Sequence, residues 1–365
     1  MKRRIPAVVL GGSGYVAGEV VRLLATHPGF ALAAVVSESR AGAPLVESYP
    51  HLAGTIDQLA FVDFAALPAL FASVPRGQEP LALISAAPHG ASAALVAQAI
   101  ALAEDAAMPL AVVDLSADFR FADAAAYAAV YGQPHPAAAL LPRFVRGLPE
   151  HVPPGGPAAG AGPCVAHPGC FTTAVLLAVV PLLALGLAEP RFAATAITGS
   201  TGSGRTPSDK THHPARRSNI AAYSPLAHRH APEMVALAGE ASGVFPEIDF
   251  VPLSGPQARG IYATVQGRLA VASGRASATE IASELASFYA ECPFVTVSTA
   301  PPALTDVVGT NRARLGVAAA GESLALTVAI DNLVKGAAGG AVQWLNRIYG
   351  FDETTGLAAA SLGWF

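Results

Sequence analysis

The chain has 365 residues, enough for two domains of ordinary size and a large buried core. Hydrophobic residues make up 52% and charged residues only 13%, which excludes a disordered protein because disorder requires low hydrophobicity and high charge. The net charge of −4 argues against a general nucleic-acid-binding protein. The longest uncharged apolar stretch, residues 164–188, is interrupted by histidine, proline and glycine, and the apolar run after the basic residues 1–4 is too short for a signal peptide. We therefore expect a soluble cytoplasmic protein with no membrane segment.

The first 150 residues alternate short β-branched runs with helix-like segments. Strands are expected at residues 7–10, 31–37, 81–86 and 110–115, and helices at residues 19–26 and 91–103. This alternation predicts a doubly wound, mainly parallel sheet. Residues 151–162, rich in proline, glycine and alanine, are the best candidate for a domain boundary.

The second half of the chain has a more mixed pattern. The segments expected there are a helix at 171–185, an extended run at 193–199, a polar basic loop region at 205–230, strands at 262–271 and 324–330, and helices at 279–289 and 338–349. This mixture predicts a second, α+β domain with a mainly antiparallel sheet.

A glycine-rich loop directly follows the first expected strand. Gly11 permits a tight turn, Gly14 lets a pyrophosphate approach the backbone, and Ala17 takes the third small position. The helix that follows offers its free N–H groups to the anion. The pattern predicts a dinucleotide-binding loop, with a purely structural glycine turn as the alternative.

The second expected strand ends in Ser37-Glu38-Ser39-Arg40, where the ribose of a bound dinucleotide would lie. An acidic residue at this place is typical of NAD enzymes, whereas an arginine suits the 2′-phosphate of NADP. The two serines and Arg40 favour NADP over NAD. The alternative is that Arg40 is only a solvated surface residue.

The stretch 167–173, His-Pro-Gly-Cys-Phe-Thr-Thr, places Cys170 at the start of an apolar helix. Unpaired N–H groups and the helix dipole stabilise a thiolate there, and the thiolate is the form that attacks a carbonyl or acyl phosphate. Cys170 is therefore the candidate nucleophile, with a small buried hydrophobic residue as the alternative. Cys164 and Cys292 lack this setting and are expected to be packing residues; the three cysteines together fit a reducing compartment.

Proton transfer requires a second group, and four of the ten histidines lie between His212 and His230. Residues 205–230 also hold five Lys or Arg residues and one acid, Asp209. This window suits a dianionic substrate, because arginine binds carboxylate and phosphate bidentately. A metal site is the competing interpretation, but the window lacks His-Glu-x-x-His spacing and its cations would repel a metal, so we expect none.

With these features, the chain resembles the N-acetyl-γ-glutamyl-phosphate reductase family, the NADP-dependent enzymes of arginine biosynthesis within the semialdehyde dehydrogenase superfamily. The resemblance covers nearly the whole length, and several motifs in one order are more specific than any single one. The motifs are Gly12-Ser13-Gly14-Tyr15, Pro88-His89-Gly90, Asp-Leu-Ser-Ala-Asp-Phe-Arg at 114–120, Pro168-Gly169-Cys170-Phe171, Gly202-Ser203-Gly204-Arg205, His-Arg-His-Ala-Pro-Glu at 228–233 and Ile-Asp-Asn-Leu-Val-Lys-Gly-Ala-Ala-Gly at 330–339.

The resemblance implies a Rossmann domain at 1–165, with residues 331–365 packing back on it, and an α+β catalytic and oligomerisation domain at 166–330. It implies Cys170 as the nucleophile and His228 as the acid/base, with His230 nearby. The implied contacts of NADP(H) are Gly11, Ser13, Gly14, Tyr15, Val16, Ser37, Ser39, Arg40, Pro88, Gly204 and Asn332. The implied substrate contacts are Arg120, Arg205, Arg229 and His230.

The implied reaction is reduction of N-acetyl-γ-glutamyl phosphate by NADPH to N-acetylglutamate semialdehyde, with phosphate release through a thioester on Cys170. The partner is then a small acyl phosphate, and the assembly a homodimer or homotetramer. The alternatives are a reductase of aminoadipyl phosphate held on a carrier protein, aspartate-semialdehyde dehydrogenase, and a regulator that binds the dinucleotide without turnover. The chain departs from the usual family pattern at His167, in place of asparagine, at Thr172, in place of proline, and at Glu38, where many relatives carry arginine.

Overall fold

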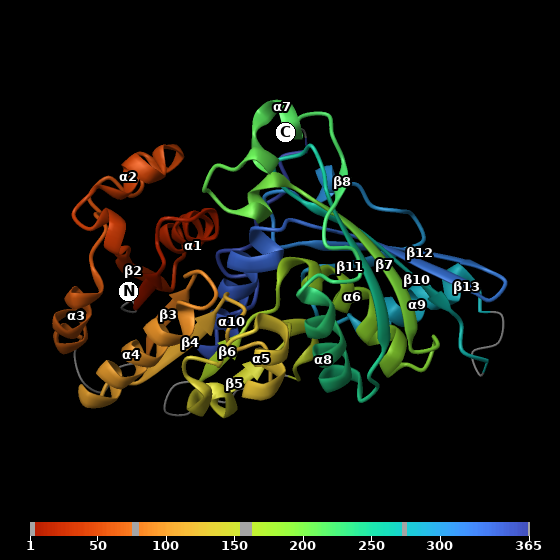
Figure 1. The fold of residues 1–365 in the computed structure, drawn as a ribbon, viewed down its shortest axis with the longest axis horizontal. Coiled ribbons are helices and arrows are strands. Elements are labelled where there is room, and N and C mark those ends of the chain that lie inside the picture. Colours follow the sequence, from red (N-terminus) through yellow and green to blue (C-terminus); the bar gives the residue numbers. More distant parts are fainter. Residues whose placement is uncertain (1–3, 75–79, 154–162, 272–275, 364–365) are drawn as a thin grey trace. The chain divides into compact units, whose positions relative to one another are not determined.

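Figure 1 shows the computed structural model of the chain, which describes residues 4–74, 80–153, 163–271 and 276–363. The first three residues of the basic N-terminal stretch, and residues 154–162 of the expected boundary, lie outside the described residues. The chain forms two compact units. Unit 1 comprises the described residues of Met1–Gly147, Pro154–His167 and Ala338–Leu357, and unit 2 those of Leu148–Pro153, Pro168–Ala337 and Ala358–Phe365.

Unit 1 is built on a parallel sheet of six strands in the order β2-β1-β3-β4-β6-β5. Every neighbouring pair in this sheet is parallel. All residues of β3 and β4 are buried, as is typical of parallel strands covered on both faces. The strands are β1 (Ile5–Leu10), β2 (Phe30–Val36), β3 (Leu81–Ser85), β4 (Leu110–Asp114), β5 (Phe144–Arg146) and β6 (Cys164–Ala166).

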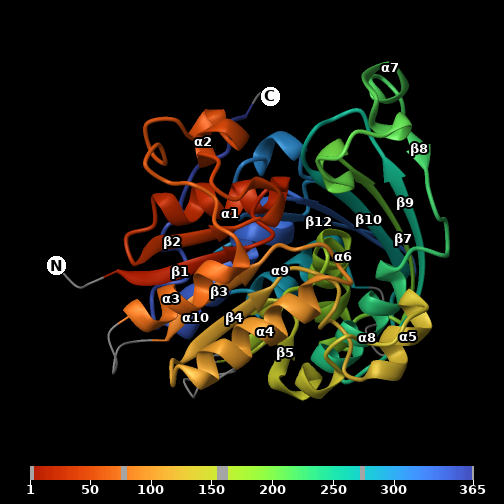
Figure 2. The same ribbon diagram turned by 60° about the vertical axis from the view of Figure 1, so that its left-hand side comes forward.

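Helices lie on both faces of this sheet. Helix α1 contacts α10, and α3 contacts α4, so four of the helices form two pairs. Figure 2 shows α4 in front of the sheet, with α10 behind it. The helices of unit 1 are α1 (Tyr15–Ala25), α2 (Leu45–Ser48), α3 (Leu67–Ser73), α4 (Ser92–Asp105), α5 (Ala124–Tyr131) and α10 (Gly339–Ile348). The doubly wound parallel domain predicted from the alternating pattern is confirmed.

Unit 2 contains a mixed sheet of seven strands in the order β11-β12-β13-β10-β7-β9-β8. The pairs β12–β13, β13–β10, β10–β7 and β9–β8 are antiparallel, whereas β11–β12 and β7–β9 are parallel. The mainly antiparallel α+β domain is thus confirmed. The strands are β7 (Arg191–Thr198), β8 (Ala221–Ala222), β9 (Glu247–Ser254), β10 (Ile261–Arg268), β11 (Val295–Ser298), β12 (Ala313–Ala320) and β13 (Ser323–Ile330).

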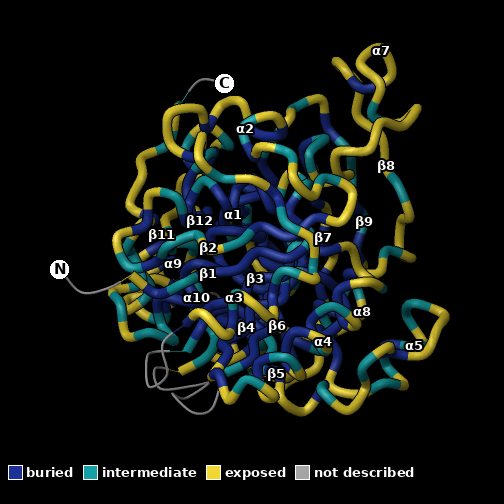
Figure 3. The backbone as a smooth tube through the Cα atoms, turned by 90° about the vertical axis from the view of Figure 1, so that its left-hand side faces the viewer, coloured by how far each residue is buried: buried dark blue, intermediate teal, exposed yellow. Residues whose placement is uncertain are grey.

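One face of this sheet packs on helices, and the other carries exposed residues such as Ala193 and Gln266. Helix α6 (Cys170–Ala184) is buried from Phe171 to Leu183 and contacts α8 (His230–Ser242), β10 and β13. Helix α9 (Ala278–Phe288) contacts β11 and β12, and α7 (His213–Arg216) lies in a largely exposed segment (Figure 3). Strand β7 alternates exposed and buried residues, as expected when only one face is covered. Within the described ranges, no helix is long and apolar enough to cross a membrane.

The chain enters α10 through a π-helix at Val334–Ala338. Residues 331–337, which the resemblance grouped with the first domain, lie in unit 2. They are held there by side-chain bonds of Asp331 to Arg259 and of Lys335 to Glu150. Residues 338–357 belong to unit 1, whereas the described residues after them belong to unit 2.

Candidate active site

The glycine-rich loop connects β1 to α1 at the carboxyl edge of the parallel sheet. Gly11 has φ +71°, and a Cβ there would lie 2.4 Å from Cα of Ala87, so the position accepts only glycine. Gly14 is the N-cap of α1, and no atom lies within 4 Å of where its Cβ would stand. The Tyr49 hydroxyl braces the loop, 2.5 Å from O of Gly12 and 3.0 Å from O of Gly14. The loop therefore leaves open space in front of a helix N-terminus, which is the arrangement that a pyrophosphate needs.

The polar residues after β2 divide into two groups. The carboxylate of Glu38 accepts a hydrogen bond from the backbone N–H of Phe64 at 2.9 Å, so it caps a neighbouring turn. Ser37 Oγ lies 3.5 Å from Ser39 Oγ, and the Arg40 guanidinium donates to Ser48 Oγ at 3.0 Å. Ser37, Ser39 and Arg40 are thus the groups at this edge with the chemistry of a phosphate contact.

The segment 114–120 holds the neighbouring loop at Pro88-His89-Gly90. The Asp118 carboxylate accepts the N–H groups of Gly90 at 2.7 Å and of Ala93 at 2.9 Å. Asp114 is fully buried at the end of β4, where hydroxyls of Ser92 and Ser116 donate to it at 2.6 Å. Burial raises the pKa of Asp114 to about 6, against the effect of these hydrogen bonds. The acids of this motif thus fix the loop that carries Pro88, a predicted cofactor contact that is exposed.

Arg120, which the resemblance placed at the substrate, is 6% exposed in unit 1. Its Nε donates to O of His167 at 2.9 Å, and its Nη2 donates to O of Leu115 at 2.8 Å. The His167 ring is buried against Gly340, where a Cβ would lie 2.2 Å from Cε1 of the ring. This placement favours a structural role for Arg120, and it explains why a glycine faces His167.

Cys170 is the first residue of α6, with Gly169 as the N-cap. The N–H of Gly169 donates to the buried Glu233 carboxylate at 2.7 Å, which fixes the turn before the helix. The backbone of Gly336 lies against Cys170, since a Cβ there would stand 2.7 Å from Cys170 Cβ. Cys170 is only partly buried, so its thiol combines a helix N-terminus with access to a substrate.

His228 lies among aromatic rings at the start of α8. Ring centroids of Tyr223, Phe171 and His230 are 5.5, 5.7 and 4.7 Å from its own. The backbone N–H of His230 donates to Nδ1 of His228 at 3.1 Å, so the neutral ring carries its proton on Nε2. Burial, and then the charge of Arg229, lower the pKa of His228 to about 4. The ring is therefore neutral near pH 7 and offers an Nε2–H donor.

Tyr223 is a candidate that the sequence did not reveal. Burial raises the pKa of its phenol above the ordinary value, and the negative charge that Cys170 can carry raises it further. The phenol therefore stays protonated and can donate a hydrogen bond. A single tyrosine in a polar loop, five positions before His228, carries no signal of its own in the sequence.

Comparisons with known proteins identify the family of this chain. The semialdehyde dehydrogenase NAD binding domain model matches residues 6–150, and the semialdehyde dehydrogenase dimerisation domain model matches residues 170–332. The N-acetyl-gamma-glutamyl-phosphate reductase of Desulforudis audaxviator (strain MP104C) is 40% identical over 363 residues, with 97% of this chain and 98% of the relative covered. The protein of the same name from Pseudomonas putida (strain W619) is 37% identical over 362 residues, with 97% and 98% covered.

The chain belongs to the N-acetyl-gamma-glutamyl-phosphate reductase family, within the semialdehyde dehydrogenases. The family resemblance carried by the sequence motifs is therefore confirmed.

Solved structures agree with the fold of this reductase. Aspartate semialdehyde dehydrogenase II of Vibrio cholerae, complexed with ASA, matches with TM-score 0.64 at 15% identity, covering 95% of this chain and 98% of that chain. The aspartate semialdehyde dehydrogenase of Candida albicans with NADP matches with TM-score 0.59 at 14% identity, covering 93% and 97%. At this identity the likeness shows the fold alone.

The remaining predicted contacts of the reductase lie in unit 2. Asn332 is buried, its Oδ1 accepting from N–H of Gly260 at 2.7 Å and its Nδ2 donating to Thr201 Oγ1 at 3.1 Å. Gly204, Arg205 and Arg229 are exposed, whereas His230 is buried beside His228. The predicted residues thus divide by unit. Unit 1 holds Gly11, Ser13, Gly14, Tyr15, Val16, Ser37, Ser39, Arg40, Pro88 and Arg120; unit 2 holds Cys170, Gly204, Arg205, His228, Arg229, His230 and Asn332.

No three or more His, Cys, Asp or Glu side chains among the described residues are grouped to hold a metal ion.

Proposed function

We propose that this reductase converts N-acetyl-γ-glutamyl phosphate into N-acetylglutamate semialdehyde and phosphate, with NADPH as the reductant, in arginine biosynthesis. The observation that carries the proposal is the position of Cys170 as the first residue of α6, in a chain whose relatives bear this enzyme name over 97% of its length. A thiolate at a helix N-terminus is a nucleophile suited to an acyl phosphate.

In the first step the Cys170 sulfur attacks the acyl carbon. A carbon–sulfur bond forms, the carbon–oxygen bond to phosphate breaks, and a thioester remains on Cys170. The departing phosphate takes up one proton from the solvent. When bound, NADPH supplies a hydride that reduces this thioester carbonyl. The oxygen of the resulting thiohemiacetal re-forms the carbonyl as the carbon–sulfur bond breaks, which releases the semialdehyde and returns the thiolate.

His228 is proposed to donate a hydrogen bond to the acyl oxygen, both when the thioester forms and when it is reduced. Its Nε2 bears the proton because Nδ1 accepts from the His230 backbone, so Nε2–H can donate where negative charge develops. A donor of this kind contributes about 3–4 kcal/mol to stabilising a tetrahedral intermediate. The protonated phenol of Tyr223, next to His228, is a second donor of the same kind.

The dinucleotide fits unit 1. The open space at Gly14 and the N-terminus of α1 suit its pyrophosphate, beside Gly11, Ser13, Tyr15 and Val16. Ser37, Ser39 and Arg40 suit a 2′-phosphate, and the Glu38 carboxylate does not stand in the way because it is bonded to N–H of Phe64. These contacts support NADP(H) over NAD(H).

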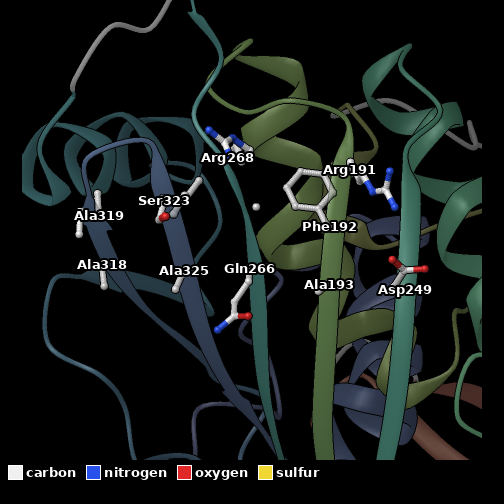
Figure 4. A pocket seen from close by; sticks show the side chains of 13 residues that line it. Arg191, Phe192, Ala193, Asp249, Gln266, Arg268, Ala318, Ala319, Ser323 and Ala325 are labelled. Carbon is white, nitrogen blue, oxygen red and sulfur yellow. The ribbon is translucent and has the colours of Figure 1, made fainter.

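The open face of the unit 2 sheet supports a homodimer, in which a second copy covers it. Its outward residues are small or polar, among them Ala193, Gln266 and Ala325, which Figure 4 labels. They line a hollow of about 560 Å³. The family model over this unit is described as a dimerisation domain. Ala325→Arg should halve the mass measured by light scattering, and an unchanged mass would place the interface elsewhere. No disulfide joins Cys164, Cys170 and Cys292, which fits the reducing compartment expected of a cytoplasmic protein.

The test is reduction of NADP⁺ by the purified protein, dependent on phosphate, with N-acetylglutamate, aspartate and aminoadipate semialdehydes in parallel. We expect turnover with the N-acetylglutamate compound, and its loss in Cys170→Ser. Full activity of Cys170→Ser would refute the thioester route. Turnover with none of the three would favour a dinucleotide-binding protein without this activity.

A further inference from the structure

The segment after β13 forms a wide turn that ends beside the nucleophile. The buried Asp331 carboxylate accepts the N–H groups of Leu333 at 2.8 Å and Val334 at 3.0 Å, and it pairs with Arg259 at 3.1 Å. The N–H of Gly336 then bonds to O of Asp331 at 2.9 Å, five residues back, as in a π-helix. Single π-turns of this kind are rare and concentrate at functional sites.

This turn touches the start of α6. A Cβ at Gly336 would lie 2.7 Å from Cβ and 3.1 Å from Cα of Cys170, so the two backbones are in close contact. A displacement of the π-turn toward α6 is therefore transmitted to Cys170, because the space between them does not admit even one further carbon atom.

Lys335, the residue before Gly336, makes an ion pair that is fully shielded from water. Its Nζ lies 2.5 Å from Oε1 of Glu150, and both side chains are 0% exposed. The ammonium also stands 5.6 Å from the centre of the Phe294 ring. Removing two charges from water offsets most of their attraction, so such a pair contributes little to stability and is better explained by the geometry it imposes.

Glu150 is itself held to α6 by its neighbour. His151 Nε2 lies 3.0 Å from the Tyr289 hydroxyl, which donates to O of Leu177 in α6 at 2.8 Å. Because the tyrosine proton is used by Leu177, the hydroxyl accepts from His151. The short helix Pro149–His151 is thus tied to α6 on one side and to the π-turn on the other.

We propose that the Lys335–Glu150 ion pair is a positioning pair for Cys170: it holds the π-turn against the first residue of α6 and so keeps the thiol at the helix N-terminus. The proposal rests on Cys170 being the nucleophile of the proposed function. Neither Lys335 nor Glu150 is assigned contact with substrate; they act through Gly336 and the backbone of Cys170.

The test separates stability from positioning with three variants. Lys335→Met and Glu150→Gln each break the pair, and Glu150→Met combined with Lys335→Met replaces both charges by apolar side chains of similar size. The readouts are the melting temperature and the rate constant for alkylation of Cys170 by iodoacetamide, followed over pH by mass spectrometry of its peptide. The values of kcat and of KM for NADP⁺ complete the set.

We expect each single variant to slow alkylation of Cys170 at neutral pH at least about tenfold, to move its pH midpoint upward and to lower kcat with little change in KM. The double variant should regain the melting temperature of the wild type, while alkylation stays slow. Normal alkylation in the single variants, or alkylation that recovers together with the melting temperature, would overturn the proposal. If a single variant does not fold, the alkylation rate of the double variant still tests the proposal.

Two controls accompany the test. Arg143→Met removes an exposed ion pair with Glu104 and should change neither readout. Leu326→Ala opens the unit 2 core and should lower the melting temperature without slowing alkylation of the folded protein. Because alkylation needs no substrate, a protein that reduces none of the tested semialdehydes can still pass or fail this test.

Discussion

The contact between Gly336 and Cys170 gives the sharpest expectation, because a single methyl group disturbs it. Gly336→Ala places a Cβ 2.7 Å from Cys170 Cβ and 3.1 Å from Cys170 Cα. Carbon atoms pack at about 3.5–4.0 Å, so the π-turn and the start of α6 must separate by about 1 Å. The contacted atoms are the backbone and Cβ of Cys170, which have no rotamer that avoids the methyl group.

The magnitude follows from this displacement. Overpacking by one methyl group costs about 1–3 kcal/mol of stability, which the lower backbone entropy of alanine in the unfolded chain offsets by about 0.5–1 kcal/mol. Misplacing a reacting group by about 1 Å costs about 100-fold in rate. We therefore expect a folded protein with about 100-fold lower kcat and a modest fall in melting temperature.

The assay is steady-state reduction of NADP⁺, together with alkylation of Cys170 and thermal unfolding. Gly29→Ala is the matched control, because its Cβ would meet Phe351 Cζ at 2.5 Å, within unit 1. It should lower the melting temperature and leave kcat of the folded protein unchanged. Wild-type kcat in Gly336→Ala, or an equal loss in both variants, would refute the reasoning.

Cofactor choice, stability in acid and the role of the buried arginine each have a direct test. Arg40→Met should lower kcat/KM for NADP⁺ relative to NAD⁺ at least about tenfold, since a charge-assisted bond to phosphate contributes about 1.5–3 kcal/mol. Glu38→Gln should change this ratio less than about threefold, because its carboxylate is bonded to a backbone amide. A larger effect would show that Glu38 contributes to cofactor choice. Burial lowers the pKa of His228 and of His151 to about 4, so below the ordinary 6.5 the unfolded chain takes up protons that the folded chain does not. Urea unfolding should therefore show stability falling as pH drops from about 6.5 toward 4, by at most about 1.4 kcal/mol per unit for each histidine. The raised pKa of Asp114 acts in the opposite direction below about pH 6 and offsets about one of the two histidines, so a net rise in stability would contradict the expectation. Arg120→Met should cost about 1–3 kcal/mol of stability by leaving buried carbonyl groups unpaired, and a rise in KM for the acyl substrate without loss of stability would restore its role as an anion contact.

The fold was predictable where residue patterns are local. Strands such as β3 and β4 are continuous runs of buried apolar residues, and the glycine-rich loop marks the first turn of the parallel sheet. Strand β9 was not predicted, because Glu247, Asp249 and Pro252 lower its strand propensity. Strand β12 was missed because it is rich in alanine, which is depleted in strands. Pairing with β11 on one side and β13 on the other holds this segment in the strand conformation.

The candidate site was predictable where one residue type at one position determines the chemistry. Cys170 at the start of α6 is such a case, since a helix N-terminus activates a thiol. The tautomer of His228 was not predictable, because it depends on the backbone amide of His230. Nor was the pairing of Lys335 with Glu150, which joins residues 185 positions apart. Such contacts are fixed by tertiary packing and leave no mark on local composition.

The buried charges of this chain change how its family motifs are interpreted. Asp114, Asp118, Arg120, Glu233 and Lys335 all lie in or beside these motifs, and all are at most 6% exposed. These side chains bond to backbone groups, to hydroxyls or, in the case of Lys335, to the Glu150 carboxylate, so they hold loops and turns in place. Other predicted contact residues are accessible instead, among them Ser13, Tyr15, Arg205 and Arg229. Substitutions of the buried residues should therefore act mainly on stability and kcat, whereas substitutions of the accessible residues should act on KM. Which effect a motif residue has is then determined by its burial and not by the motif to which it belongs.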